Sequence, residues 1–223
     1  MKSVAESALV LGVSEARVRQ MIAAAVLPAV RVGNRWVIDD AALTSFRPAP
    51  SGRPWQPSAA WGVLWVGLGR PAEWLTDKQR QRAHQRAAHG VSTYTNELRN
   101  RSEREMFSVH PSALEHMRTD DRIVLSGWSA ASEVGADLLG GGDLVEGYVA
   151  RKSRQRLKSV YGLTVAGSSP NVVLHVVDGL WPFAKNERIA PAVVVALDLL
   201  EHNDQRSNRA GKTLLASALK AMT

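Results

Sequence analysis

The sequence predicts an α+β protein, and three observations lead to this prediction. The first 46 residues read helix, tight turn, helix, hairpin, short helix, which is the order of a winged helix-turn-helix. A proline-dense stretch follows, and after it strand-like runs mix with helical segments, as in a mixed α/β domain. We therefore expect a first domain over residues 1–47, a linker over 48–60 and a second domain over 61–223, of which 61–110 is mostly helical.

The composition is ordinary for a globular protein in water, with 45% hydrophobic and 22% charged residues among 223. No apolar run approaches the roughly 20 residues of a membrane span, and the N-terminus lacks the layout of a signal peptide. Cysteine is absent, which excludes disulfides and thiolate metal sites. We expect a cytoplasmic protein with no membrane partner.

The formal net charge of +7 favours a polyanionic partner. The excess is uneven along the chain. Residues 1–50 carry six basic and four acidic groups, residues 51–110 carry nine and five, and residues 111–223 carry thirteen and twelve. The positive charge is therefore concentrated in the N-terminal half.

Local signals justify the two helices of the first domain. Ser3 is expected to cap the first helix, and Gly12 suits the tight turn that ends it. Ser14 is the next cap, and Glu15 in the first turn complements the helix dipole. The inward apolar face of the second helix is then formed by Val18, Met21 and Ile22.

A hairpin should follow. In residues 29–32 two valines alternate with alanine and arginine, which predicts a half-buried strand. Gly33 and Asn34 make a two-residue turn, with glycine at a position that needs positive φ, and the next four residues return as the second strand. Asp39 or Asp40 is expected to cap a short closing helix.

The second domain begins with predicted helices. Pro71 suits the first position of a helix that runs to His89, and a second helix is expected over residues 92–106. Ser112 then starts a short helix. The remaining expected elements are a strand or buried segment over 122–128 that runs into a helix over 128–139, a glycine turn at 140–142, a strand at 144–150, a basic helix or turn at 151–161, a strand at 171–177, a helix opened by Pro191 and a last helix at 207–222.

The first domain has the residue types that read DNA. In a helix-turn-helix the start of the second helix reaches base edges, and the wing holds phosphates or enters the minor groove. Arginine can pair with guanine and glutamine with adenine. The alternative is a solvated helix face and an ordinary hairpin, with Trp36 in either case expected in the core of the wing. The predicted DNA-binding residues are Arg17, Arg19, Gln20, Arg31, Asn34 and Arg35.

The segments LGVSEARVRQMI, LPAVRVGNRWVID and AALTSF resemble the excisionase and MerR-type DNA-binding domains. The resemblance covers about residues 3–47, and LPAVRVGNRW is its most specific part. MerR activators continue into a long dimerising coiled coil. Here prolines interrupt the chain instead, so a MerR-type sensor is not expected.

The remainder resembles a second family. RSEREMFSVHPSALEHMRTDDRIVLSGWSAA, the YV…NVVLHVV pair and PAVVVALDLLEHNDQRSNRAGKTLL are similar to the AbiEi-type antitoxins of bacterial abortive-infection systems. The resemblance covers about residues 101–219. It implies an N-terminal winged helix joined to an antitoxin domain, repression of the protein's own operon, and a nucleotidyltransferase toxin as partner.

Two basic clusters have no assigned role. The first is the KQRQRAHQR run over residues 78–86. In the second, three basic residues would share one helix face, with Leu157 and Val160 towards the core. Each cluster could contact DNA phosphates, RNA or an acidic partner, or be a solvated face. The second cluster consists of Arg151, Lys152, Arg154, Arg156 and Lys158.

Several catalytic interpretations fail. Residues 211–213 (GKT) resemble the end of a phosphate loop, but Arg206 stands where that motif needs glycine. The six histidines lack metal-ligand spacing, and residues 126–129 lack the nucleophile-elbow pattern. Asp198 and Asp204 are expected to be capping or surface groups. We therefore expect no catalytic residue, metal or cofactor.

The leading hypothesis is an antitoxin, without enzymatic activity, that represses its own operon. If it acts as a homodimer, its operator DNA should contain half-sites about one helical turn apart. The alternative is an excisionase-like architectural protein or a phage or prophage transcriptional regulator. A nucleic-acid enzyme with a DNA-targeting domain is a weaker third hypothesis, since no catalytic set converges in the sequence.

Overall fold

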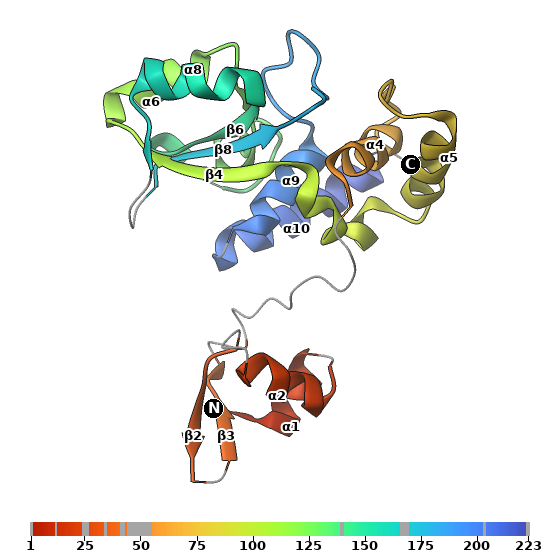
Figure 1. Cartoon of the computed structure of the whole chain (residues 1–223), viewed down its shortest axis with the longest axis vertical. Helices are drawn as coiled ribbons and strands as arrows, with labels where there is room; N and C mark the ends of the chain where they lie inside the picture. The colour runs from red at the N-terminus through yellow and green to blue at the C-terminus, as the bar shows by residue number, and fades with distance from the viewer. Residues whose placement is uncertain are drawn as a thin grey trace. The chain divides into compact units, whose positions relative to one another are not determined.

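The chain forms two compact units, Met1–Ser51 and Gly52–Thr223, each with its own hydrophobic core (Figure 1). The structure is a computed structural model. It describes residues 2–11, 13–23, 27–33, 35–40, 43, 55–138, 141–165, 170–202 and 204–221.

The first unit contains the predicted helices and hairpin. Ser3 caps α1 as predicted: its Oγ accepts a hydrogen bond from the Glu6 amide at 3.3 Å, and its own amide donates to the Glu6 carboxylate at 2.7 Å. Ser14 Oγ likewise accepts from the Arg17 amide at 3.3 Å, next to the first turn of α2. The elements are β1 (Lys2–Ser3), α1 (Val4–Leu11), α2 (Glu15–Ala23), β2 (Ala29–Val32) and β3 (Arg35–Ile38), with sheet order β1-β3-β2.

The hairpin forms in the predicted place, but the face of β2 that points to the core is the opposite of the predicted one. Gly33 has the positive φ that its turn requires, at 59°. The register pairs Ala29 with Ile38, which is fully buried, so Ala29 lies on the core side of the strand. Val30 and Val32 consequently lie on the opposite face and are each 60% exposed, contrary to the half-buried pattern predicted for them. Asn34 lies outside the described residues.

The second unit is built on a five-stranded sheet of order β5-β6-β8-β4-β7. β6 and β8 are parallel, and the other neighbours are antiparallel. Its elements are α4 (Pro57–Gly67), α5 (Asp77–Ala88), η1 (Val91–Tyr94), η2 (Glu97–Arg101), β4 (Glu103–Ser108), η3 (Pro111–Ala113), α6 (Leu114–Thr119), β5 (Val124–Leu125), α7 (Gly127–Ala130), η4 (Gly141–Asp143), β6 (Val145–Ala150), α8 (Arg151–Tyr161), β7 (Thr164–Val165), β8 (Val172–Val177), α9 (Ala192–Glu201) and α10 (Gln205–Lys220).

Helices cover both faces of this sheet. Figure 1 shows α6 and α8 on one side and α9 and α10 on the other. The central strand β8 is buried along its whole length, as expected for a strand covered on both faces. α9 is buried from Val193 to Leu199 and packs on α10 and α7. Helices and sheets together confirm the α+β class.

The N-terminal part of the second unit departs from prediction in two places. The expected linker ran to residue 60, but α4 begins at Pro57, where proline suits a first helical position, and Ala60 is buried. The helix expected from Pro71 begins at Asp77 instead. Thr76 forms a capping box with Gln79, which satisfies two backbone amides at that point. The described residues begin again at 55, so residues 48–54 of the predicted linker cannot be compared.

The helix predicted over residues 92–106 is not formed. Two short 3-10 helices occupy its first part, and β4 occupies the rest and runs antiparallel to β8. Pairing with a fully buried strand outweighs the helical tendency of this segment. The region expected to be a mostly helical lead-in therefore contributes a strand to the sheet.

The later elements follow the sequence more closely. The predicted strands are present as β6 and β8, and the basic helix is α8. Pro191 precedes α9, and Asp204 caps α10 by accepting from the Ser207 amide at 2.7 Å, as predicted for a capping residue. Gly141–Asp143 form a 3-10 turn, and Gly140 lies outside the described residues. Val160, predicted to face the core, is 57% exposed.

A glycine allows α9 and α10 to pack closely, and this gives a test of the packing. A Cβ at Gly211 would lie 2.9 Å from the Ala196 carbonyl oxygen and 3.1 Å from Leu199 Cβ. Gly211→Ala should therefore lower the free energy of unfolding by about 1–3 kcal/mol, although alanine is the better helix former by about 1 kcal/mol. Urea unfolding measures the change.

Gly142→Ala is the matched control. Gly142 is exposed, and nothing lies within 4 Å of its Cβ position, so this variant should be as stable as the parent. A Gly211→Ala variant more stable than the parent would contradict the packing described for α9 and α10.

Candidate functional sites

The second helix of the first unit divides its residues between core and solvent as predicted. Val18 and Met21, which the sequence predicts to point inward, are buried. All the positions that the sequence predicts to point outward are exposed. The buried pair packs against Leu27 and Ile38, which fixes the rotation of α2 about its own axis. The exposed residues are Glu15, Ala16, Arg17, Arg19 and Gln20.

The exposed polar side chains of α2 contact one another. Arg17 Nη1 donates to Gln20 Oε1 at 3.3 Å, so these two predicted base-reading residues lie side by side. Arg19 forms an ion pair with Glu15 at 2.8 Å, one turn earlier. An exposed i,i+4 pair contributes only about 0.3–0.5 kcal/mol, so Arg19 can exchange this carboxylate for a phosphate at small cost.

The wing separates its two arginines. Arg31 is paired in register with Trp36, and Val32 with Arg35, so Arg31 and Arg35 lie on opposite faces of the hairpin. The Arg31 guanidinium lies 5.9 Å from the centre of the Trp36 ring. Trp36 is 37% exposed, so the prediction that it belongs to the wing core is wrong. Trp36 lies on the same face of β3 as Ile38 but two residues nearer to the turn, outside the core cluster of this unit.

The basic cluster of the second unit is engaged largely within the protein. Arg151 pairs with Glu103, and Arg154 with Glu105, both at 2.7 Å. The Lys158 ammonium lies 5.1 Å from the centre of the Phe107 ring. Glu103, Glu105 and Phe107 are alternate residues of β4. The three residues predicted to share a helix face therefore do so, and that face is directed at β4.

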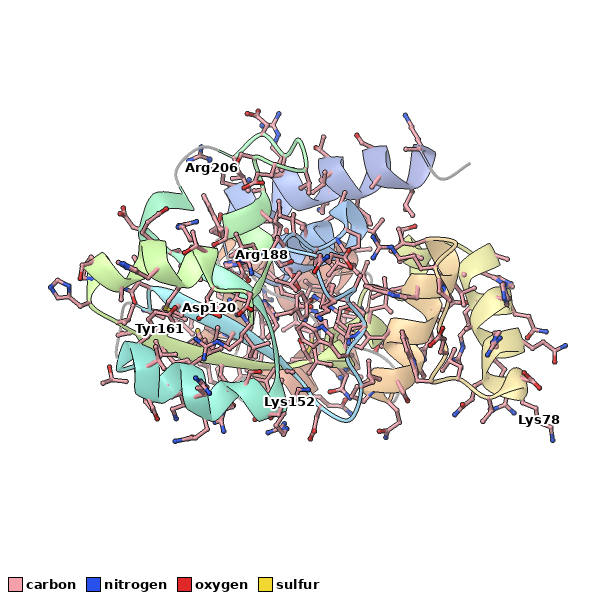
Figure 2. All side chains as sticks on the ribbon, turned by 90° about the horizontal axis from the view of Figure 1, so that it is seen from above. Lys78, Asp120, Lys152, Tyr161, Arg188 and Arg206 are labelled. Atoms are coloured by element: carbon pink, nitrogen blue, oxygen red, sulfur yellow. The ribbon has the colours of Figure 1, made fainter. Side chains whose placement is uncertain are left out.

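The rest of the cluster is open to solvent. Lys152 and Arg156 are exposed on α8, and Figure 2 shows Lys152 at the beginning of this helix. Of the five basic residues predicted as a nucleic-acid or partner contact, these two present their charge outwards.

A second group of polar side chains joins the end of α8 to the turn that follows α6. The Tyr161 hydroxyl donates to the Asp120 carboxylate at 2.8 Å, and Arg122 Nε donates to it at 2.8 Å (Figure 2). Burial alone would raise the pKa of Asp120, but the hydrogen bonds from Arg122 and Tyr161 lower it. Arg188 donates to the carbonyls of Asp120 and Arg118. These contacts join α6, α8 and the segment before α9.

A buried ionic cluster lies beneath the sheet, centred on Arg101 at the end of η2. The Arg101 side chain is 1% exposed and donates to the carboxylates of Asp198 and Glu201 on α9. It also donates to the Tyr148 hydroxyl at 2.8 Å, which in turn donates to Asp198 at 2.7 Å. Burial would lower the pKa of Arg101, but Glu201, Tyr148 and Asp198 raise it well above its usual value.

Glu146 forms the second half of this cluster. Its two carboxylate oxygens lie 3.0 Å from His175 Nε2 and 2.8 Å from His202 Nε2. Burial would raise the pKa of Glu146, but the hydrogen bonds from both histidines hold it far below 4.5. The pKa of His175 is raised above 6.5: burial opposes the charge, but Asp198 and Glu146 favour it. Among the described residues, every buried side-chain polar atom has a partner.

Asp198 is thus a buried anchor, and the prediction that it is a capping or surface group is wrong. The sequence held a usable signal, because Asp198 is the one charged residue inside the apolar run AVVVALDLL. A carboxylate so placed must be buried and must have a partner. Which residue supplies that partner depends on the tertiary fold, since Arg101 is 97 positions away.

His175, Asp198 and Glu201 could in principle hold a metal, because their ligand atoms lie within 4.8 Å of one another. The Arg101 guanidinium already contacts both carboxylates and provides the cation that they require. The three residues therefore fit an internal ion pair better than a metal site.

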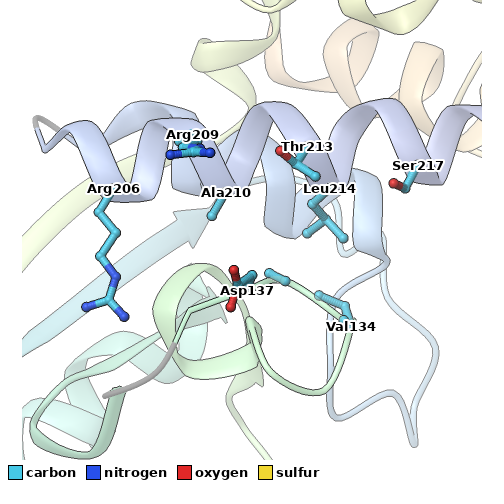
Figure 3. Close-up of a pocket in the computed structure, with 10 residues that line it drawn as sticks. Val134, Asp137, Arg206, Arg209, Ala210, Thr213, Leu214 and Ser217 are labelled. Atoms are coloured by element: carbon cyan, nitrogen blue, oxygen red, sulfur yellow. The ribbon is translucent and has the colours of Figure 1, made fainter.

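The residues that resembled a phosphate loop are helical, as predicted. Positions 211–213 lie within α10. Thr213 contributes to a cleft of about 550 Å³ between α10 and the residues around Asp137 (Figure 3). Arg206 and Arg209 line the same cleft, and Figure 3 shows Arg206 extending across it. Among the described residues it is α9, and not a strand, that precedes this helix, so the phosphate-loop interpretation stays excluded.

Comparison with known proteins identifies the first unit. Residues 3–47 match the family model of a helix-turn-helix domain. No curated protein and no solved structure matches the chain. The N-terminal unit is therefore a helix-turn-helix domain, which supports the predicted excisionase-like DNA-binding domain. None of the described helices combines the length and the hydrophobicity that a membrane span requires.

The ionic cluster predicts a large effect of a single substitution. Arg101→Met leaves Asp198 and Glu201 without their buried cation and should lower the free energy of unfolding by about 3–5 kcal/mol. Chemical denaturation measures the loss. Arg104→Met is the control, because Arg104 is exposed on the adjacent strand and should change stability by about 0.5 kcal/mol or less. Equal stability of the two variants would show that the cluster does not hold the unit together.

Proposed function

We propose that the protein is an antitoxin that also represses its own operon, acting in the cytoplasm on operator DNA. The observation that carries the DNA-binding part is the rotation of α2. Val18 and Met21 are buried, which leaves Arg17 and Gln20 adjacent and exposed at the start of the helix that enters the major groove in this domain type.

The wing supports the same interface. Arg31 and Arg35 lie on opposite faces of a hairpin, so one can contact a phosphate while the other enters the minor groove. Exposed Val30, Val32 and Trp36 add apolar surface to the wing. A homodimer on DNA would place two such units on half-sites about one helical turn apart.

The antitoxin part of the proposal rests on the second unit and its resemblance to AbiEi-type antitoxins. We propose that this unit engages a nucleotidyltransferase toxin and that it has no catalytic activity of its own. Its buried acid and base side chains gather in a cluster whose groups are hydrogen-bonded to one another: Glu146, His175 and Asp198 are all 1% exposed or less. A substrate would have no room beside them.

An excisionase-like or prophage regulatory role is the second candidate, and the helix-turn-helix match at residues 3–47 favours it. The neighbouring gene separates the two. A nucleotidyltransferase supports the antitoxin, and an integrase supports the excisionase-like protein.

Arg17→Ala tests the base-reading surface. Loss of a bidentate arginine–guanine contact should cost about 1–3 kcal/mol of binding to the operator while leaving random duplex DNA much less affected. The measurement is the ratio of the two dissociation constants at fixed salt. Arg209→Ala, an exposed arginine of the second unit, is the control. If Arg17→Ala leaves the ratio unchanged, Arg17 does not read the operator.

Co-expression tests the antitoxin role. Induction of the neighbouring gene alone should arrest growth, and co-expression of this chain should restore it, with the two proteins purifying together. Arg17→Ala should still restore growth, because neutralisation is assigned to the second unit. Rescue that depends on Arg17 would instead point to transcriptional control, and absence of rescue would remove the antitoxin assignment.

A further inference from the structure

Three adjoining concavities in the second unit share wall residues. The largest, about 680 Å³, lies between the end of α4 and the loop after β8, and Trp65, Trp74 and Trp181 line it. A second of about 370 Å³ shares Arg70, Pro71 and Glu73 with it and extends along α5. A third of about 320 Å³ shares Trp181 and reaches the start of α8. We refer to these three concavities together as the groove. It extends from the basic segment of residues 78–86 to the basic segment of residues 151–158, neither of which has an assigned role.

The middle of this groove is an aromatic wall that is already held in place. The Trp74 indole donates to the Ser58 carbonyl at 3.0 Å. Trp65 and Trp181 both meet the buried Phe183 edge-on, with ring centres 5.6 and 5.1 Å apart. Trp74 and Trp181 are only half-buried, so aromatic surface remains open. A wall fixed in this way loses little side-chain entropy when a ligand stacks on it.

The two ends of the groove carry cations. Arg80 on α5 is exposed at one end, and Lys152 is exposed at the other. In Figure 2, Lys78 at the beginning of α5 and Lys152 at the beginning of α8 lie along the same margin of the unit.

The acidic residues of the groove are mostly neutralised. Glu187 is paired with Arg70, and Asp178 with Arg151, each at 2.7 Å. Arg70 also lies over Trp65, with its guanidinium carbon 5.2 Å from the ring centre. Glu73 is the remaining carboxylate in the lining. The groove is therefore aromatic in the middle and basic towards both ends.

We infer that this groove binds single-stranded nucleic acid. Unpaired bases stack on aromatic side chains while basic residues follow the phosphates, and this combination is the one present here. Bases of a duplex are already stacked on their neighbours and cannot use the tryptophans. A proline-rich peptide would use the aromatic wall but would gain nothing from the cations at either end. The inference is independent of DNA reading by the first unit.

The test uses the full chain carrying Arg17→Ala, Arg31→Ala and Arg35→Ala, which removes the proposed base contact and the proposed phosphate contacts of the first unit. Fluorescence anisotropy follows labelled 15-nucleotide oligo(U) and oligo(dT), with a 15-base-pair random duplex for comparison. Trp181→Ala should weaken single-strand binding by about 5- to 100-fold through lost stacking, and Trp181→Phe should recover most of it. A preference for oligo(U) identifies RNA as the ligand, and a preference for oligo(dT) identifies single-stranded DNA.

The phosphate contact at the Lys152 end of the groove is tested separately, by the salt dependence of binding. Lys152→Ala should reduce the slope of log affinity against log salt by about 0.7, the value for one phosphate contact on a single strand. Lys212→Ala, an exposed lysine on α10 outside the groove, should leave the slope unchanged. The inference is overturned if the duplex binds as tightly as the single strands, if Trp181→Ala binds them like its parent, or if Trp181→Ala abolishes binding of a proline-rich peptide while no oligonucleotide binds.

Discussion

The buried guanidinium of Arg101 is the contact on which the second unit depends. It joins the end of η2 to α9 through Asp198 and Glu201, and to β6 through Tyr148. Its backbone carbonyl accepts from the Trp61 indole at 2.8 Å, which adds α4 to the same junction. A buried charge is expensive unless its partners are placed well. These elements must therefore assemble together, and the sheet and its covering helices have one arrangement that satisfies the group.

Ion pairs also neutralise charges outside the core, so the net charge of +7 overstates how much basic surface is open to a partner. Of the basic residues of α8 that face β4, Arg151 and Arg154 are each paired with a carboxylate of that strand, and Lys158 lies over the Phe107 ring. A large part of the apparent basic patch is therefore internal structure. Lys152 and Arg156 remain directed at solvent. On α8 a partner would therefore meet two separate cationic side chains and not a continuous basic face.

Local signals were sufficient for the two helices and the hairpin turn of the first unit and for the central strands of the second. Caps at Ser3 and Ser14, the turn glycine and the apolar spacing of α2 all act within a few residues, and the structure contains each of them. β4 and the Arg101–Asp198 pair could not be predicted, because they depend on partners far away in the sequence. Trp36 is exposed although it lies on the same face of β3 as Ile38, because it is nearer to the turn and outside the core cluster, and alternation alone does not show where that cluster ends. Of the predicted DNA contacts, exposure and mutual geometry are now described for all but Asn34, and contact with DNA stays a prediction.

The distribution of tryptophan has a spectroscopic consequence. Six of the seven lie in the second unit, where Trp61 is fully buried, and the first unit contains Trp36 alone. Because each unit has a separate core, their unfolding transitions need not coincide. Intrinsic fluorescence therefore follows mainly the second unit, and replacing Trp36 with phenylalanine would make it follow that unit exclusively. Far-ultraviolet circular dichroism, which is sensitive to both units, would then isolate the melting of the helix-turn-helix by difference.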